Sequence, residues 1–90
     1  MPVSSNVREI KWFADTKILT VWFMDGSIYD YNMSAIPNYD EVVSLVTKGM
    51  ASATTEGEAN GVRWWVGKNP SFGAAIHEYL STGMIPYTSR

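Results

Sequence analysis

The sequence predicts an α+β fold: a three-stranded antiparallel β-meander followed by a helix, a fourth strand and a second helix. Three consecutive segments of the N-terminal half alternate apolar or aromatic residues with other residues at a period of two, which is typical of strands. Two later segments carry apolar residues at spacings of three and four, which is typical of helices. With 90 residues, the chain is expected to form a single domain, residues 1–90.

The first predicted strand covers residues 7–14 and follows a polar turn. Strict alternation places Ile10 and Trp12 on one side of this strand and Val7 and Phe13 on the other. A short polar connection leads into the second strand. The three strands are therefore expected to pair in the order in which they follow along the chain.

The hairpin at residues 17–31, KILTVWFMDGSIYDY, forms the centre of the predicted sheet, and Asp25-Gly26 is a strong turn signal within it. A two-residue turn would pair Phe23 with Ile28. A three-residue loop with Gly26 in the left-handed conformation would instead pair Val21 with Tyr29. The two registers exchange the faces of the strand. We favour the three-residue loop because it keeps the Asp30 side chain off the apolar face. It gathers Leu19, Val21, Phe23, Tyr29 and Tyr31 on that face.

The first helix is predicted after Ile36-Pro37, because proline fits the first turn of a helix. Its apolar stripe consists of Tyr39, Val42, Val43 and Val46. Asp40 and Glu41 lie near its start and Lys48 near its end, where each charge interacts favourably with the helix dipole. Gly49 is expected to end it.

The second half of the chain starts with small and polar residues at 50–60, which are expected to form a loop, with a short strand as the alternative. Asn60-Gly61 predicts a turn. Residues 62–66, VRWWV, then predict the fourth strand. Its alternation places Val62, Trp64 and Val66 on one face and Arg63 and Trp65 on the other.

The second helix is predicted to start at Asn69-Pro70, with the asparagine as its cap, and to end at Gly83. Its apolar stripe consists of Phe72, Ala75, Ile76, Tyr79 and Leu80. The tail at residues 84–90 is apolar at its start, so we expect it to dock on the domain or to contact a partner.

The composition excludes several classes of protein. A formal charge of −2 argues against a general nucleic-acid binder, which needs many cations to displace phosphate counterions, but it allows one small anionic ligand in a local basic site. The chain has no cysteine, no apolar run near the ~18 residues of a membrane span and no signal peptide, so a cytoplasmic location is expected. No triad order or metal-ligand spacing stands out, and the single histidine, His77, is expected on a solvated helix face. We therefore expect neither catalysis, nor a cofactor, nor a metal.

Four short motifs together carry a family resemblance. They are V-S-S-N at residues 3–6, L-x-V-x-F at 19–23, G-x-x-Y-x-Y at 26–31 and I-P-x-Y at 36–39. In this order and spacing they resemble the KTSC domain, which is named for a C-terminal appendage of some lysyl-tRNA synthetases, and the resemblance covers roughly residues 3–50. It implies a small α+β domain, with RNA binding suggested for the family, and it supplies no catalytic residue.

The first candidate site is an anion site at the start of the second helix. Arg63, Lys68, Asn69 and Ser71 could converge there with the free N–H groups of the helix N-terminus. Trp64 or Trp65 could stack a base beside it. The alternative is an ordinary capped helix next to a solvated strand end.

Aromatic and apolar residues of the meander form two further candidates. Tyr29 and Tyr31 could stack bases, as sheet aromatics do in RNA-binding modules, or could be core residues. The second face of the sheet carries Ile18, Trp22 and Ile28. Either the second half of the chain covers that face or another subunit does, in which case these residues form an interface.

The leading hypothesis for function is a non-catalytic binding module for RNA or a nucleotide-like anionic ligand. The alternative is a small phage-type interaction protein that inhibits a host protein or sequesters a nucleotide signal. Self-association into a homo-oligomer is expected in either case. The two hypotheses differ in what the protein contacts: a basic, aromatic site in the first, and a flat apolar patch or a symmetric assembly in the second.

Overall fold

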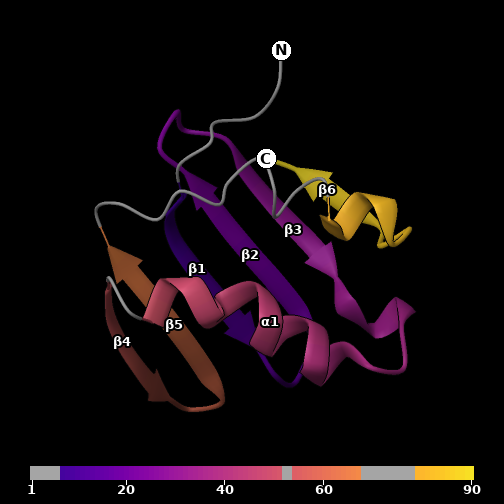
Figure 1. Ribbon diagram of the computed structural model, residues 1–90, viewed down its shortest axis with the longest axis horizontal. Helices are drawn as coiled ribbons and strands as arrows, with labels where there is room; N and C mark the ends of the chain where they lie inside the picture. The colour runs from indigo at the N-terminus through magenta and orange to yellow at the C-terminus, as the bar shows by residue number, and fades with distance from the viewer. Residues whose placement is uncertain (1–6, 52–53, 68–78) are drawn as a thin grey trace.

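The computed structural model describes residues 7–51, 54–67 and 79–90. They form one six-stranded antiparallel sheet in the order β4-β5-β1-β2-β3-β6, with a helix lying across one face (Figure 1). The elements are β1 (Val7–Phe13), β2 (Ile18–Phe23), β3 (Ile28–Asn32), the short 3-10 helix η1 (Met33–Ala35), α1 (Tyr39–Ala51), β4 (Thr54–Ala59), β5 (Val62–Gly67) and β6 (Tyr87–Ser89). The predicted α+β class, with a meander followed by a helix and further strands, is confirmed.

The β2–β3 hairpin has the predicted register. Val21 lies opposite Tyr29. The Phe23 N–H donates to the carbonyl of Ser27 at 2.9 Å, and the Gly26 N–H donates to the carbonyl of Phe23 at 3.0 Å. Gly26 has φ +94°, a conformation that glycine adopts without a steric penalty. The three-residue loop is therefore confirmed.

The helix-side face of the sheet, which we call the covered face, holds the core. α1 packs its predicted stripe onto this face, and Val42, Val43 and Val46 are buried there. The core cluster consists of Val7, Ile10, Trp12, Leu19, Val21, Phe23, Tyr31, Met33, Val42, Val43, Val46, Trp65, Leu80 and Ile85. Every helical segment that the structure describes contributes to this cluster, so all of them lie on the covered side.

Strand β1 contains a bulge that corrects one prediction. Val7 pairs with Phe23 and Glu9 pairs with Trp22, so the register shifts by one residue between them. A bulge of this kind turns the following residues to the other face. Val7 therefore lies in the core with Ile10, and the prediction that it faces away from that residue is wrong.

Helix α1 also differs from its predicted bounds. It begins at Tyr39, so Pro37 precedes the helix, and the Val42 N–H donates to the carbonyl of Asn38 at 3.2 Å. Its last residue is Ala51, so Gly49 does not end it. A glycine inside a helix costs only about 1 kcal/mol relative to alanine, and packing of the stripe outweighs this cost.

Residues 54–59 form strand β4, which is the alternative that we left open for this segment. β4 pairs with β5 across a two-residue turn in which Asn60 and Gly61 both have positive φ, 54° and 79°. Such a turn matches the right-handed twist of the flanking strands. The turn predicted at Asn60-Gly61 is confirmed.

The C-terminal segment docks on the domain, as one of the two alternatives predicted. Residues 79–82 are helical, and β6 adds to the edge of β3. The helix ends in a Schellman motif: the Ile85 N–H donates to the carbonyl of Leu80 at 3.2 Å, and the Met84 N–H donates to that of Ser81 at 3.0 Å. The left-handed residue of this motif is Met84, with φ +62°, and Gly83 precedes it. The predicted start of this helix at Asn69 lies outside the described residues.

Candidate functional site

The face of the sheet away from α1, which we call the open face, carries no helix or strand of the described chain. Residues that pair directly across neighbouring strands point to the same face. The pairing therefore arranges this face in three rows. They are Val62, Phe13, Ile18 and Asn32; then Trp64, Lys11, Thr20, Asp30 and Thr88; and then Val66, Glu9, Trp22 and Ile28. Most of the apolar members are partly exposed, and Val66 is 41% exposed.

Trp22 lies between two cations on this face. The Lys11 Nζ atom lies 5.5 Å from the centre of the Trp22 ring, and the Arg90 Cζ atom lies 5.9 Å from it. Arg90 reaches this position because its backbone N–H donates to the carbonyl of Ile28, directly after β6. The indole is a good partner for such cations. At Trp22, the open face therefore has an aromatic surface next to two positively charged side chains.

A polar network holds Arg90 in place. The Asp30 carboxylate accepts hydrogen bonds from Arg90 Nε at 2.9 Å and from Arg90 Nη2 at 3.1 Å, and one from the Thr20 hydroxyl. Partial burial acts to raise the pKa of Asp30, but the hydrogen bonds from Arg90 and Thr20 outweigh it and lower that pKa. The carboxylate is therefore charged at neutral pH and orients the guanidinium beside Trp22.

Trp64 lies against the backbone of the outermost strand. It pairs with Gly57 of β4, and a Cβ atom at that glycine would overlap the indole ring. A glycine inside a strand often marks a place where another group approaches the backbone closely. Gly57 was therefore a signal of this contact that the sequence already contained. Gly57 was not predicted as part of a site, and neither were Lys11 and Arg90 as neighbours of Trp22.

The structure separates the described residues of the predicted anion site. Trp65 is 2% exposed and lies in the core on the covered face, whereas its neighbour Trp64 lies on the open face. Arg63 lies on the covered side, with its Cζ atom 4.9 Å from the Trp65 ring and its Nε atom 4.0 Å from Glu58 Oε2. Arg63 and Trp64 therefore point away from each other. The other predicted members, Lys68, Asn69 and Ser71, lie outside the described residues.

The two tyrosines of the Y-x-Y motif belong to the covered face. Tyr31 is fully buried, and Tyr29 packs against the core. Both contact Tyr87 of β6, with ring centres 5.6 Å from Tyr29 and 5.8 Å from Tyr31. Burial is the main cause that raises the pKa of Tyr31, and the neighbouring Tyr29 and Tyr87 raise it further. Tyr31 thus has no exposed ring on which a base could stack, so the core interpretation describes Tyr31, whereas Tyr29 is partly buried at the edge of the core.

The predicted interface residues Ile18, Trp22 and Ile28 lie on the open face and are partly exposed. Within the described residues, no cluster of histidine and acidic side chains is suited to a metal ion. The helices of the described chain are too short or too polar to cross a membrane. Of the predicted groups of site residues, Ile18, Trp22 and Ile28 are the group that the described residues bring together on one partly exposed face.

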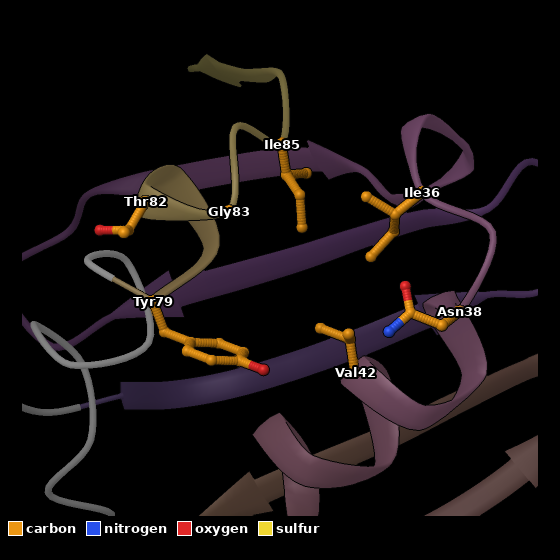
Figure 2. Close-up of a pocket in the computed structure, with 7 residues that line it drawn as sticks. All are labelled: Ile36, Asn38, Val42, Tyr79, Thr82, Gly83 and Ile85. Carbon is orange, nitrogen blue, oxygen red and sulfur yellow. The ribbon is translucent and has the colours of Figure 1, made fainter.

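A second feature lies on the covered side, where α1 meets the C-terminal segment. It is a pocket of about 600 Å³ (Figure 2). Its lining residues are Ile36, Asn38, Val42, Tyr79, Thr82, Gly83 and Ile85. None of them is charged, so this pocket differs in character from the open face.

Comparison with known proteins bears on the N-terminal half of the chain. No curated protein and no solved structure matches the sequence. A family model does match: the KTSC domain, over residues 3–37. The match covers β1, β2, β3 and η1 and ends before α1. The KTSC resemblance predicted from the four motifs is therefore confirmed over residues 3–37, and in this part the chain is similar to the KTSC domain.

Proposed function

We propose that this chain is a non-catalytic binding module that holds single-stranded RNA or a nucleotide on its open face. The observation that carries the proposal is Trp22, which is partly exposed on that face with Lys11 and Arg90 beside its ring. Bases stack on exposed sheet aromatics, and nearby cations attract the phosphates. Trp64 and Phe13 supply two further aromatic surfaces on the same face.

The charge of the open face favours a stacked ligand over a long phosphate backbone. Among the described residues beside Trp22, the cations Lys11 and Arg90 are accompanied by the acids Glu9 and Asp30, and Glu9 Oε2 lies 3.6 Å from Lys11 Nζ. Few phosphates can therefore be neutralised. With two contacts to a single strand, the slope of log affinity against log salt should be about −1.4. Duplex RNA should bind poorly because its bases are already stacked.

The test compares native protein with Trp22→Ala in titrations of single-stranded RNA hexanucleotides and mononucleotides, followed by tryptophan fluorescence. Loss of one stacking contact should lower the affinity about tenfold or more. Lys11→Gln should weaken binding less and should flatten the salt dependence. The control is Leu45→Ala, which truncates an exposed apolar residue of α1 and should leave affinity unchanged. If no ligand binds more tightly than about 1 mM at low salt, the proposal fails.

A second candidate function is that of an interaction protein, such as a phage-type inhibitor of a host protein, which would bury the same face. The observation that favours it is the apolar content of that face, which includes Phe13, Ile18 and Ile28 around Trp22. Analytical ultracentrifugation would distinguish the two functions. If a second copy covers the face, the native protein sediments as a dimer, and Trp22→Glu dissociates it without unfolding. A monomer at high concentration that binds RNA would exclude self-association through this face.

A further inference from the structure

The pocket between α1 and the C-terminal segment is built by three separate parts of the chain. Ile36 precedes α1, Val42 lies in its first turns, and Ile85 follows the helical residues 79–82. Val42 and Ile85 are also members of the core cluster. The floor of the pocket is therefore part of the apolar core that remains accessible from outside. Figure 2 shows these three side chains directed into the same space.

Tyr79 forms one wall of this pocket. Tyr79 is 48% exposed, whereas the next residue, Leu80, is completely buried. Figure 2 shows the Tyr79 ring extending toward Val42, so one face of the ring borders the space. An aromatic ring over an aliphatic floor is suited to a flat apolar molecule.

Two polar side chains converge on the pocket from opposite sides. The Tyr79 hydroxyl and the Asn38 carboxamide both point toward the space near Val42, while the Thr82 side chain points away from it (Figure 2). A hydroxyl and a carboxamide can each donate and accept hydrogen bonds. Since none of the described lining residues is charged, these residues would not compensate a charged ligand on desolvation.

We propose that this pocket binds a small, uncharged, planar heterocycle. Its apolar face would lie between Tyr79 and the aliphatic floor, and its polar edge would meet the Tyr79 hydroxyl and the Asn38 carboxamide. A volume of about 600 Å³ lies within the range of small-molecule sites, which are mostly apolar with a few convergent polar groups. The site lies on the side of the sheet opposite Trp22, so the proposal does not depend on RNA binding at the open face.

The experiment uses two probes of the same shape. Benzimidazole is planar and uncharged at pH 7.5 and carries one N–H donor and one nitrogen acceptor, whereas indene lacks both. NMR titration of methyl-labelled native protein should show benzimidazole shifting the methyl signals of Ile36, Val42 and Ile85, with a dissociation constant on the order of 1 mM. Indene should bind about tenfold more weakly or more.

Two conservative variants test the polar contacts. Tyr79→Phe removes the hydroxyl but keeps the ring, and Asn38→Ser removes the carboxamide but keeps a residue that favours the start of a helix. Each should weaken benzimidazole binding about three- to tenfold and leave indene binding unchanged. Trp22→Ala should bind benzimidazole like the native protein, which separates this proposal from the function of the open face.

Three outcomes would overturn the proposal. They are the absence of shifts at the pocket methyls, equal affinity for the two probes, and unchanged benzimidazole binding by both conservative variants. Thermal melting of each variant shows that it remains folded. A loss of affinity can then be assigned to the contact and not to unfolding.

Discussion

Both faces of the sheet carry large apolar residues, but the two faces differ in what lies on them. On the covered face, Ile10, Leu19 and Val21 have no exposed surface. On the open face, Ile18 and Trp22 are the neighbours of Leu19 and Val21 in β2, and Ile28 pairs with Trp22; all three remain partly exposed. Both faces carry tryptophan, isoleucine and valine. Residue type alone therefore does not identify the core in this protein; the position of α1 does.

The difference also separates two roles for aromatic residues. Tyr31 and Trp65 are enclosed and contribute to stability, because burying large rings removes much apolar area from water. Trp22 and Trp64 keep part of their surface in solvent and are available to a ligand or partner. Substitutions on the two faces should therefore differ in their effect on stability.

The adjacent tryptophans of β5 give the largest contrast. Trp65→Ala should lower the free energy of unfolding by about 3–5 kcal/mol, because it opens a cavity in the core. Trp64→Ala, on the opposite face of the same strand, should lower it by about 1–2 kcal/mol, because less area is lost. Urea unfolding followed by circular dichroism measures both. Equal losses would show that the open face is also covered in solution.

The assignment of residues to faces depends on the hairpin loop at Gly26. Gly26→Ala should lower the free energy of unfolding by about 1 kcal/mol or more, because its φ of +94° is unfavourable for a residue with a Cβ atom. Gly83→Ala is the matched control, since a Cβ atom there would meet only ordinary contacts, the nearest at 3.5 Å. Thermal or chemical unfolding of the two variants side by side makes the comparison. A neutral Gly26→Ala would show that the loop adopts another conformation in solution.

The C-terminal segment contains one residue in a strained backbone conformation, Met84. Met84 has φ +62° at the position where a Schellman motif favours glycine, and this residue is 86% exposed. Met84→Gly should therefore stabilise the protein by about 0.5–1 kcal/mol and raise the melting temperature by roughly 3–6 °C. Met84→Ala keeps the strain and should have little effect. Destabilisation by Met84→Gly would mean that the methionine side chain makes a contact that its exposure does not reveal.

The smallest predicted effect is the pH dependence of the polar network on the open face. The pKa of Asp30 is lower in the folded protein than its ordinary value of 3.8. The contribution of Asp30 to the free energy of unfolding is therefore fully present above pH 3.8, and it is lost as the pH falls through the pKa of the folded state. The contribution should be about 1 kcal/mol or less, because the ion pair is partly solvated. Asp30→Asn should be less stable than native protein at pH 7, and the difference should shrink below pH ~4. A difference that does not vary with pH would argue against the ion pair.

Local patterns predicted the elements whose partners are close in sequence. The Asp25-Gly26 loop, the register of Val21 with Tyr29 and the stripe of α1 each depend on residues within one hairpin or one helix. Alternation also placed Trp64 and Trp65 on opposite faces. It could not indicate which of the two faces α1 would cover, because both tryptophans fit an apolar face equally well.

The remaining features depend on long-range contacts or on backbone irregularity. The bulge near Arg8 leaves no signature in an alternating strand, and it reversed the predicted position of Val7. Strand β4 consists of threonine, glutamate, glycine and alanine, and most of these residues have low strand propensity, so it forms because β5 offers a partner. Arg90 reaches Asp30 across 60 positions of the chain, and no short-range pattern predicts such a pair. The position of Arg90 beside Trp22 on the open face could not be predicted for this reason.

The outer strands of the sheet have a consequence for solubility. An unpaired strand edge is a template on which another chain can add, and such growth leads to aggregates. Here one outer strand, β6, is only three residues long, and the other, β4, carries Glu56 and Glu58 on a single side. Two copies that met edge to edge through β4 would bring these like charges together, which disfavours pairing. The sheet is thereby protected against growing sideways into a larger sheet, and contacts between molecules are directed to its flat faces.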